Sequence, residues 1–341
     1  MPTRRHCLLL PLAALALPVQ ALPPRTLSFP RDFGAHPELR TEWWYLTGHA
    51  TAAGGLELGF QLTFFRTRVD AAQALSSRFA ARQLIFAHAA VTDLAGGRLL
   101  HDQRIAREGF GLAQAATEDT DLRLDGWTLQ RSGPVERSSY RALLAAREFT
   151  LDLAFESTQP LLLQGEQGLS RKGPEAKQAS YYYSRPQLRV QGRITLGGKP
   201  LAVEGRAWMD HEWSEELLHP QARGWDWMGM NLDDGSALTA FRLRRADGSS
   251  LWDGGSFRGA GQGVRNFAAG SVRWTPLRWW TSPLTQARYP VDWQVDTPAG
   301  RYEVRARLDA QELDSRNSTG AVYWEGLSNL LDAQGRRVGR G

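Results

Sequence analysis

Short apolar segments, separated by turns that contain glycine or proline, follow one another along almost the whole sequence after residue 30. The 34 glycines and 17 prolines mark these turns, and such a pattern is typical of successive β-hairpins. The clearest pair is 225–232 and 236–244, joined by Asp233-Asp234-Gly235, a turn that favours a hairpin. Apart from a short helix expected over residues 70–81, no amphipathic helix stands out. The sequence therefore predicts an all-β fold.

The chain is long enough for two domains, because 341 residues can form two separate cores. The tryptophan-rich hairpin at 43–62 resembles the hairpin at 225–243, about 180 residues later. This fits a duplicated barrel, and the alternative is a coincidence between two similar hairpins. We expect an N-terminal barrel at 22–205 and a C-terminal barrel at 206–341. The thirteen tryptophans either line a cavity or fill large β cores.

The first 21 residues have the features of an export signal. Arg4 and Arg5 precede a short apolar run at 8–17, and Val19-Gln20-Ala21 suits cleavage after Ala21. We therefore expect a periplasmic or secreted protein. Cys7 is the only cysteine, so the mature chain has no thiol for a disulfide, a nucleophile or a metal.

Several functional classes lack their sequence signatures. The basic residues are scattered, which argues against a nucleic-acid partner. The sequence contains neither a G-x-S-x-G nucleophile motif nor a phosphate-binding glycine loop. His36, His49, His88 and His211 match no local metal-binding spacing. We expect neither a cofactor nor a metal.

Two strands place acidic residues beside aromatic ones. Side chains alternate across a strand, so Trp208, Asp210 and Glu212 share one face, and His211 and Trp213 take the other. In the next strand the same alternation places Asp226 on the face of two methionines. A carboxyl group among apolar side chains has a raised pKa and is a candidate acid. The alternatives are an aspartate that reaches water at a strand end, and a structural lock between the barrels.

A series of motifs then points to a family. These are DFGAHPELRTEWWYLTGH (32–49), GFQLTFFR (59–66), FAHAAVTD (86–93), SRKG (170–173), YYYS (181–184), GRAWMDHEWS (205–214), GWDWMGMNLDDG (224–235), QEL (311–313) and YWEG (323–326). Together they resemble the AttH-like, carotenoid 1,2-hydratase-like family of exported lipocalin-like proteins. The resemblance implies two tandem lipocalin-like (calycin-type) antiparallel β-barrels. Similar chains usually continue with another strand, so we expect either an open edge in the last barrel or an incomplete sequence.

The resemblance also implies a function. Some members add water across the terminal C=C bond of acyclic carotenoids, and others are known as secreted hydrolases or as accessories of transporters. Hydration of an alkene needs a protonated carboxylic acid, aromatic faces beside the cation and a base for water. We predict Asp210 or Asp226 as the acid, His211 as the base, and Trp213 with Trp227 as the cation shields. The other predicted ligand-binding residues are Trp44, His88, Tyr182, Trp208 and Trp225.

Two functions remain open at this point. One is a cofactor-free hydro-lyase that acts on an isoprenoid, a carotenoid-like molecule or another apolar alkene. The other is a carrier of an apolar small molecule or lipid, with an inner-membrane transporter as a second candidate partner. Glu42 is expected to form a structural ion pair with Arg66 across a hairpin rather than to act on a ligand.

Overall fold

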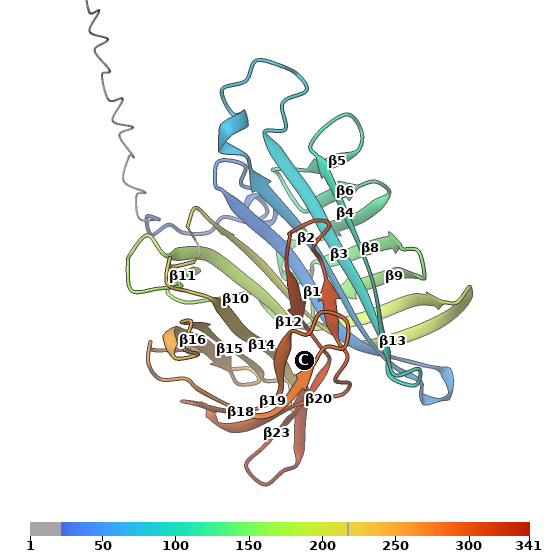
Figure 1. Cartoon of the computed structure of the whole chain (residues 1–341), viewed down its shortest axis with the longest axis vertical. Helices are drawn as coiled ribbons and strands as arrows, with labels where there is room; N and C mark the ends of the chain where they lie inside the picture. The colour runs from blue at the N-terminus through green and yellow to red at the C-terminus, as the bar shows by residue number, and fades with distance from the viewer. Residues whose placement is uncertain (1–21, 217) are drawn as a thin grey trace, which may run out of the picture.

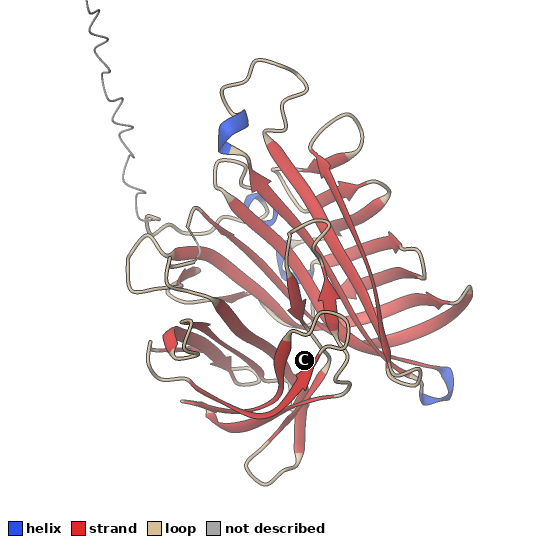
Figure 2. Ribbon diagram, viewed as in Figure 1, coloured by secondary structure: helices blue, strands red, loops and turns tan. Residues whose placement is uncertain are grey.

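The computed structural model describes residues 22–216 and 218–341. The predicted signal segment and Cys7 lie outside the described residues. The described chain is built from strands, and its only helical segments are single 3-10 turns (Figure 2). These turns are η1 (Arg31–Phe33), η2 (Ala53–Gly55), η3 (Asp70–Ala72) and η4 (Val135–Arg137). The helix expected over 70–81 was wrong beyond η3, since residues 73–81 form turns and irregular backbone. No helix in the described ranges is both long and apolar enough to cross a membrane.

The first sheet has thirteen antiparallel strands (Figure 1). Their order is β4-β3-β2-β1-β13-β12-β9-β8-β7-β6-β5, and two short strands, β10 and β11, also pair with β12. The bounds are β1 (Thr41–Ala52), β2 (Glu57–Arg68), β3 (Gln83–Asp93), β4 (Arg98–Arg107), β5 (Ala113–Ala115), β6 (Asp121–Leu124), β7 (Trp127–Ser132), β8 (Ser139–Ala145), β9 (Phe149–Glu156), β10 (Leu162–Leu163), β11 (Leu169–Arg171), β12 (Ala179–Leu196) and β13 (Lys199–Ser214). The sheet curls until β3 and β4 approach β5 and β6, which gives a near-barrel.

The second sheet has nine strands in the order β17-β16-β15-β14-β24-β23-β20-β19-β18. The bounds are β14 (Gly224–Leu232), β15 (Ala237–Arg244), β16 (Ser250–Arg258), β17 (Val264–Phe267), β18 (Arg273–Thr281), β19 (Arg288–Thr297), β20 (Gly300–Ala306), β23 (Ser328–Leu331) and β24 (Arg337–Arg340). β21 (Glu312–Asp314) and β22 (Val322–Trp324) form a separate hairpin. β24 lies between β14 and β23 in the middle of this sheet, where Figure 1 marks the chain end. The predicted all-β fold of two antiparallel, lipocalin-like sheets is confirmed.

The predicted domain boundary at 205/206 lies inside β13. This strand pairs with β1 from Val203 to Ser214, and the chain enters the second sheet only at Gly224. The division into two domains stays a prediction. The change from the first sheet to the second falls between Ser214 and Gly224.

Strand alternation decides which side chains form the core. One face of β1 and β2 carries Trp44, Leu46, Leu62 and Phe64, all fully buried in the core of the first sheet. Trp127 fills the same core. Large apolar side chains therefore occupy the space enclosed by this sheet. This agrees with the prediction that tryptophans fill large β cores. The opposite face of the sheet meets the second sheet, because β12 and β13 contact β14, and Tyr45 on β1 packs against Trp227 of β14. We call this region the junction.

Candidate functional site

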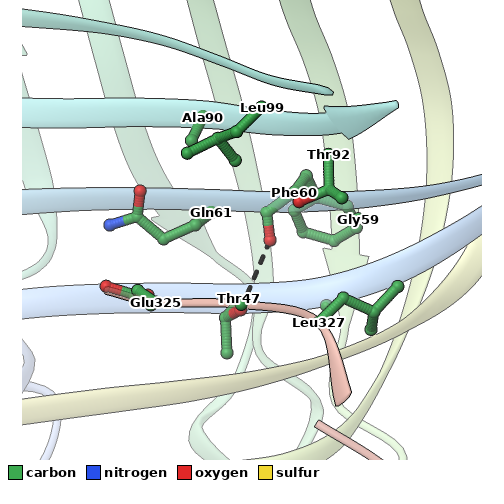
Figure 3. A pocket seen from close by; sticks show the side chains of 11 residues that line it. Thr47, Gly59, Phe60, Gln61, Ala90, Thr92, Leu99, Glu325 and Leu327 are labelled. Carbon is green, nitrogen blue, oxygen red and sulfur yellow. Dashed lines mark hydrogen bonds between the residues drawn. The ribbon is translucent and has the colours of Figure 1, made fainter. Parts of the chain in front are cut away.

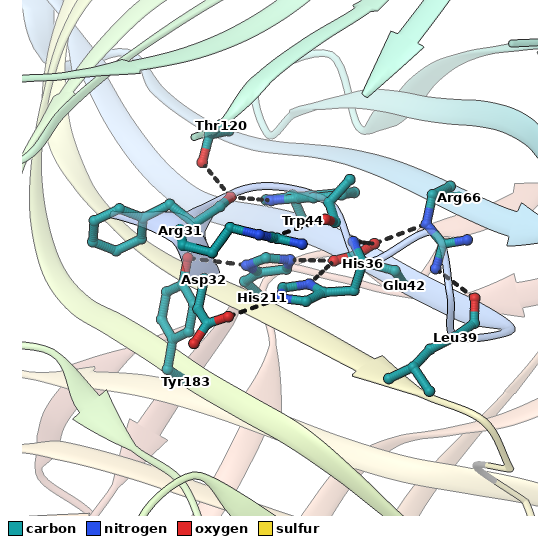
Figure 4. A network of polar contacts seen from close by, with 12 residues as sticks. Arg31, Asp32, His36, Leu39, Glu42, Trp44, Arg66, Thr120, Tyr183 and His211 are labelled. Atoms are coloured by element: carbon teal, nitrogen blue, oxygen red, sulfur yellow. Dashed lines mark hydrogen bonds and ion pairs between the residues drawn. The ribbon is translucent and has the colours of Figure 1, made fainter. Parts of the chain in front are cut away.

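The enclosed end of the first sheet holds a buried polar cluster, the inner cluster, formed by Asp32, His36, Glu42, Arg66 and His211 (Figure 4). Oε1 of Glu42 accepts hydrogen bonds from His36 Nδ1 at 2.7 Å and from His211 Nε2 at 2.9 Å. Oε2 of Glu42 accepts from Arg66 Nε at 2.8 Å. His36 Nε2 lies 3.0 Å from Asp32 Oδ1. The predicted pair of Glu42 and Arg66 is therefore confirmed.

The charges of the inner cluster balance one another. Burial would lower the pKa of His36, but hydrogen bonds to Asp32 and Glu42 outweigh burial and raise it. Both ring nitrogens of His36 face carboxylate oxygens, which only accept, so the ring donates from both and is an imidazolium. Burial would raise the pKa of Glu42, but its hydrogen bonds from His211 and His36 hold it well below the usual range. Burial lowers the pKa of His211 to about 4, so this ring is neutral.

A metal ion is a poor fit for the inner cluster, although ligand atoms of His36, Glu42 and His211 lie within 4.8 Å of one another. Both nitrogens of His211 have partners, because Nδ1 lies 3.0 Å from the hydroxyl of Tyr183. The guanidinium of Arg66 already neutralises the carboxylate, and it would repel a cation. The cluster has the features of a structural lock, that is, a set of buried hydrogen bonds that holds β1, β2 and β13 together.

Two predicted ligand-binding tryptophans belong to the inner cluster's walls. The ring of Trp213 stacks on His36 with centroids 4.0 Å apart, and Trp44 stacks on His211 at 4.5 Å. Both indoles are fully buried. Trp213, predicted as a cation shield, and Trp44, predicted only as a ligand-binding residue, therefore shield the inner cluster from water.

The other face of β13 carries Asp210 at the junction between the sheets. Its carboxylate oxygens accept hydrogen bonds from Tyr182 Oη at 2.8 Å, Ser184 Oγ at 2.5 Å and Trp208 Nε1 at 2.7 Å. Asp210 is only 3% exposed, and no cation of the described chain is among the groups that shift its pKa. Burial raises its pKa to about 7 despite the three hydrogen bonds. Asp210 can therefore exist as a neutral acid near neutral pH.

A second carboxyl group reaches the same junction from the segment that follows β22. Burial raises the pKa of Glu325 to about 7. Tyr45 on β1 lies opposite Asp210 in the strand register. Burial raises the pKa of Tyr45 well above its usual value, and the nearby charges of Glu325 and Asp210 add to this effect. We call Tyr45, Tyr182, Ser184, Asp210 and Glu325 the junction cluster.

Other acidic residues near the junction are charge-compensated. Lys172 Nζ lies 3.0 Å from Glu212 Oε1. Asp226 Oδ2 lies 2.7 Å from Arg242 Nε and 2.9 Å from Arg244 Nε. The structure therefore places Asp226 between two guanidinium groups, in an ion-pair network rather than in an apolar site.

The remaining predicted ligand-binding residues are spread around the junction. Trp227 packs edge-on against Tyr45 with centroids 5.5 Å apart, and Trp208 meets Trp227 at 6.5 Å. His88 Nδ1 lies 2.8 Å from the hydroxyl of Tyr323. Trp225 is 41% exposed. The structure therefore brings Asp210, Tyr182, Trp208 and Trp227 together, and leaves His211, Trp44 and Trp213 on the far side of the sheet.

Sequence reasoning missed Tyr45 and Glu325. Both lie within motifs that carried the family resemblance, at 32–49 and 323–326. The only sequence signal that could have identified them was their position within these motifs. Nothing in the local pattern indicated that the two motifs meet.

Comparison with known proteins agrees with this architecture. The AttH-like family profile matches residues 20–341, and the chain belongs to that family. A crystal structure from Nitrosomonas europaea assigned to AttH is 47% identical, with a TM-score of 0.87 over 94% of this chain and 97% of that one. No curated protein matches the sequence.

Two further solved structures share the fold at low identity. Kievitone hydratase from Nectria haematococca is 15% identical, with a TM-score of 0.70 over 93% of this chain and 94% of that one. CghA in complex with Sch210972 is 13% identical, with a TM-score of 0.53 over 88% and 86% of the two chains. At this identity the likeness describes the fold alone, and the family assignment rests on the AttH-like profile.

Proposed function

We propose that the protein is exported, binds an apolar isoprenoid or lipid alkene at the junction between its sheets, and adds water across a C=C bond. One observation carries this proposal. Asp210 and Glu325 both have pKa values near 7 and flank the same side chain, Tyr45, without a compensating cation in the described structure. Such a pair can supply a proton and accept one at neutral pH.

The chemistry balances with these two groups. The carboxyl group of Asp210 gives its proton to one alkene carbon, and the π electrons form the new C–H bond. The other carbon becomes a cation, to which a water oxygen forms a C–O bond. The proton released from water passes to the carboxylate of Glu325, and the net change is addition of one H₂O. Proton exchange with solvent restores both groups.

The surroundings of Asp210 favour this sequence of charges. The three donors to its carboxylate stabilise the anion left after proton transfer. The aromatic faces of Tyr45, Trp208 and Trp227 lie beside it, and such faces attract a cation. Burial excludes bulk water, which strengthens each electrostatic interaction.

The test is oxygen incorporation from H₂¹⁸O. We expect the wild type to convert an acyclic carotenoid into a product that carries one ¹⁸O atom. Asp210→Asn should reduce the rate about 10²- to 10⁴-fold, and Glu325→Gln should do the same, while both proteins remain folded. Glu156→Gln, an exposed substitution on β9, is the matched control. Lack of incorporation by the wild type with carotenoid, isoprenoid and unsaturated fatty-acid probes would overturn the proposal.

A different observation favours a carrier. A groove of about 580 Å³ lies on the surface beside η4 and the segment that leads into β10, and its apolar lining includes Phe29, Val135, Leu161 and Leu163. Its volume is within the range of small-molecule sites. If this groove holds the ligand, mass spectrometry of the purified protein would detect a co-purifying apolar molecule. Val135→Asp should then release it, and Asp210→Asn should not.

A further inference from the structure

A small pocket lies beside the junction cluster, between β1, β2 and the segment that follows β22 (Figure 3). Its polar side chains are those of Thr47, Gln61, Thr92 and Glu325, and the rest of the lining is apolar or glycine. The pocket has a volume of about 10 Å³, which is about the space that one water molecule needs. An organic ligand cannot occupy it.

Two buried oxygen atoms at this pocket lack a hydrogen-bond partner in the described part of the chain. They are Oε1 of Gln61 and Oε1 of Glu325. Gln61 is only 5% exposed, and its Nε2 donates to Thr63 Oγ1, which directs the amide oxygen away from Thr63. A buried acceptor without a partner costs about 1–3 kcal/mol, and a bridging water removes this cost.

We propose that this pocket is a water site, in which Gln61 and Glu325 each accept one hydrogen bond from a single water molecule. The inference deepens the proposed function and rests on it for the catalytic role. With both hydrogens directed to protein oxygens, the lone pairs of the water remain free to form the C–O bond. Glu325 takes the released proton directly from this water. Gln61 transfers no proton and is a positioning residue.

The site is tested first without any substrate. We expect an atomic-resolution crystal structure to show one ordered water within hydrogen-bonding distance of both Gln61 Oε1 and Glu325 Oε1. Gln61→Met keeps the side-chain length and removes the acceptor, so the water should disappear while the fold is kept. Gln130→Met on β7, outside the pocket lining, should retain the water. A pocket without water in the wild type would overturn the inference, as would water retained in Gln61→Met.

A second readout follows the protonation of Glu325 in solution. Loss of the water removes a hydrogen-bond donor to the Glu325 carboxylate, so Gln61→Met should raise the titration midpoint of its infrared carbonyl band. The band is assigned by its loss in Glu325→Gln. An unchanged or lowered midpoint would contradict the inference.

The proposed function and the water site can fail separately. An ordered water without any ¹⁸O incorporation would leave the site standing and remove the hydratase proposal. Incorporation of ¹⁸O with a pocket that holds no water would support the hydratase proposal and remove the water site. If both hold, Gln61→Met should lower kcat about 10²-fold, as expected for a misplaced nucleophile, with little change in KM.

Discussion

Asp210 and His211 are neighbours in β13, yet they belong to clusters with opposite electrostatic designs. On the enclosed face, His211 donates to Glu42, whose charge is matched by Arg66 and by protonated His36. On the junction face, Asp210 receives hydrogen bonds only from neutral groups. One cluster is a closed set of compensated charges, and the other keeps a carboxyl group whose charge state is free to change.

The difference separates a structural role from a chemical one. A buried carboxylate with a guanidinium and an imidazolium partner cannot gain a proton near neutral pH without breaking strong interactions. A buried carboxyl group without a cation titrates near neutral pH and can exchange protons with a ligand. Glu212, on the same face as Asp210, supports the distinction, because Lys172 compensates it. Burial alone therefore does not identify the acid.

The largest expected effect on the free energy of unfolding comes from disruption of the inner cluster. Glu42→Gln leaves the buried Arg66 and His36 without their shared counter-ion. Breaking a buried pair in this way should lower the free energy of unfolding by about 3–5 kcal/mol. Urea denaturation at neutral pH measures it.

A matched control uses an exposed pair in the same sheet. Glu156 and Arg189 lie 3.3 Å apart, with both side chains more than half exposed, and Glu156→Gln should cost less than about 1 kcal/mol. If Glu42→Gln costs no more than this control, the inner cluster is not a lock and its distinction from the junction cluster fails.

The two faces should also respond oppositely to pH. The pKa of Asp210 rises from 3.8 to about 7 on folding, so its contribution to stability is present at low pH and is lost as pH rises through about 7. The pKa of His211 falls from 6.5 to about 4, so its contribution is present above pH 6.5 and is lost as pH falls towards about 4. Between pH 4 and 6.5 the two groups therefore act with opposite slopes.

Unfolding measured at several pH values between 4 and 8 tests this. Asp210→Asn should make the free energy of unfolding rise more steeply with pH in the shared window, and His211→Gln should make it rise less. Each change in slope is at most about 1.4 kcal/mol per pH unit for one proton. Equal slopes in wild type and Asp210→Asn would mean that Asp210 is ionised throughout, which removes it as an acid.

The sequence predicted the faces of the strands better than it predicted the partners on them. Alternation alone separated Asp210 from His211 and placed Trp208 beside Asp210, because the period of two holds in any regular strand. The pair of Glu42 and Arg66 followed from a hairpin whose turn at 53–55 is visible in the sequence. Local geometry was sufficient in both cases.

Contacts between distant segments were beyond such reasoning. Glu325 joins Tyr45 only because the chain after β22 packs on the outer face of β1, and no local pattern encodes that packing. The partner of Asp226, in contrast, could have been predicted from the sequence. The turn at 233–235 sets the register that pairs Asp226 with Arg242, so counting across the hairpin would have found the ion pair.

The smallest expected effect concerns Asp226, the other candidate acid. Asp226→Asn removes the anion between Arg242 and Arg244. Asp226 and Arg242 are 11% exposed and Arg244 is 34% exposed, so solvent screens the network only in part and the free energy of unfolding should fall by about 1–2 kcal/mol. Above pH 7, Asp210→Asn should raise the free energy of unfolding, because that substitution removes an uncompensated buried charge. Urea denaturation of both variants at pH 8 makes the comparison. If Asp226→Asn raises stability instead, Asp226 carries the uncompensated charge, and the assignment of the acid to Asp210 has to be reversed.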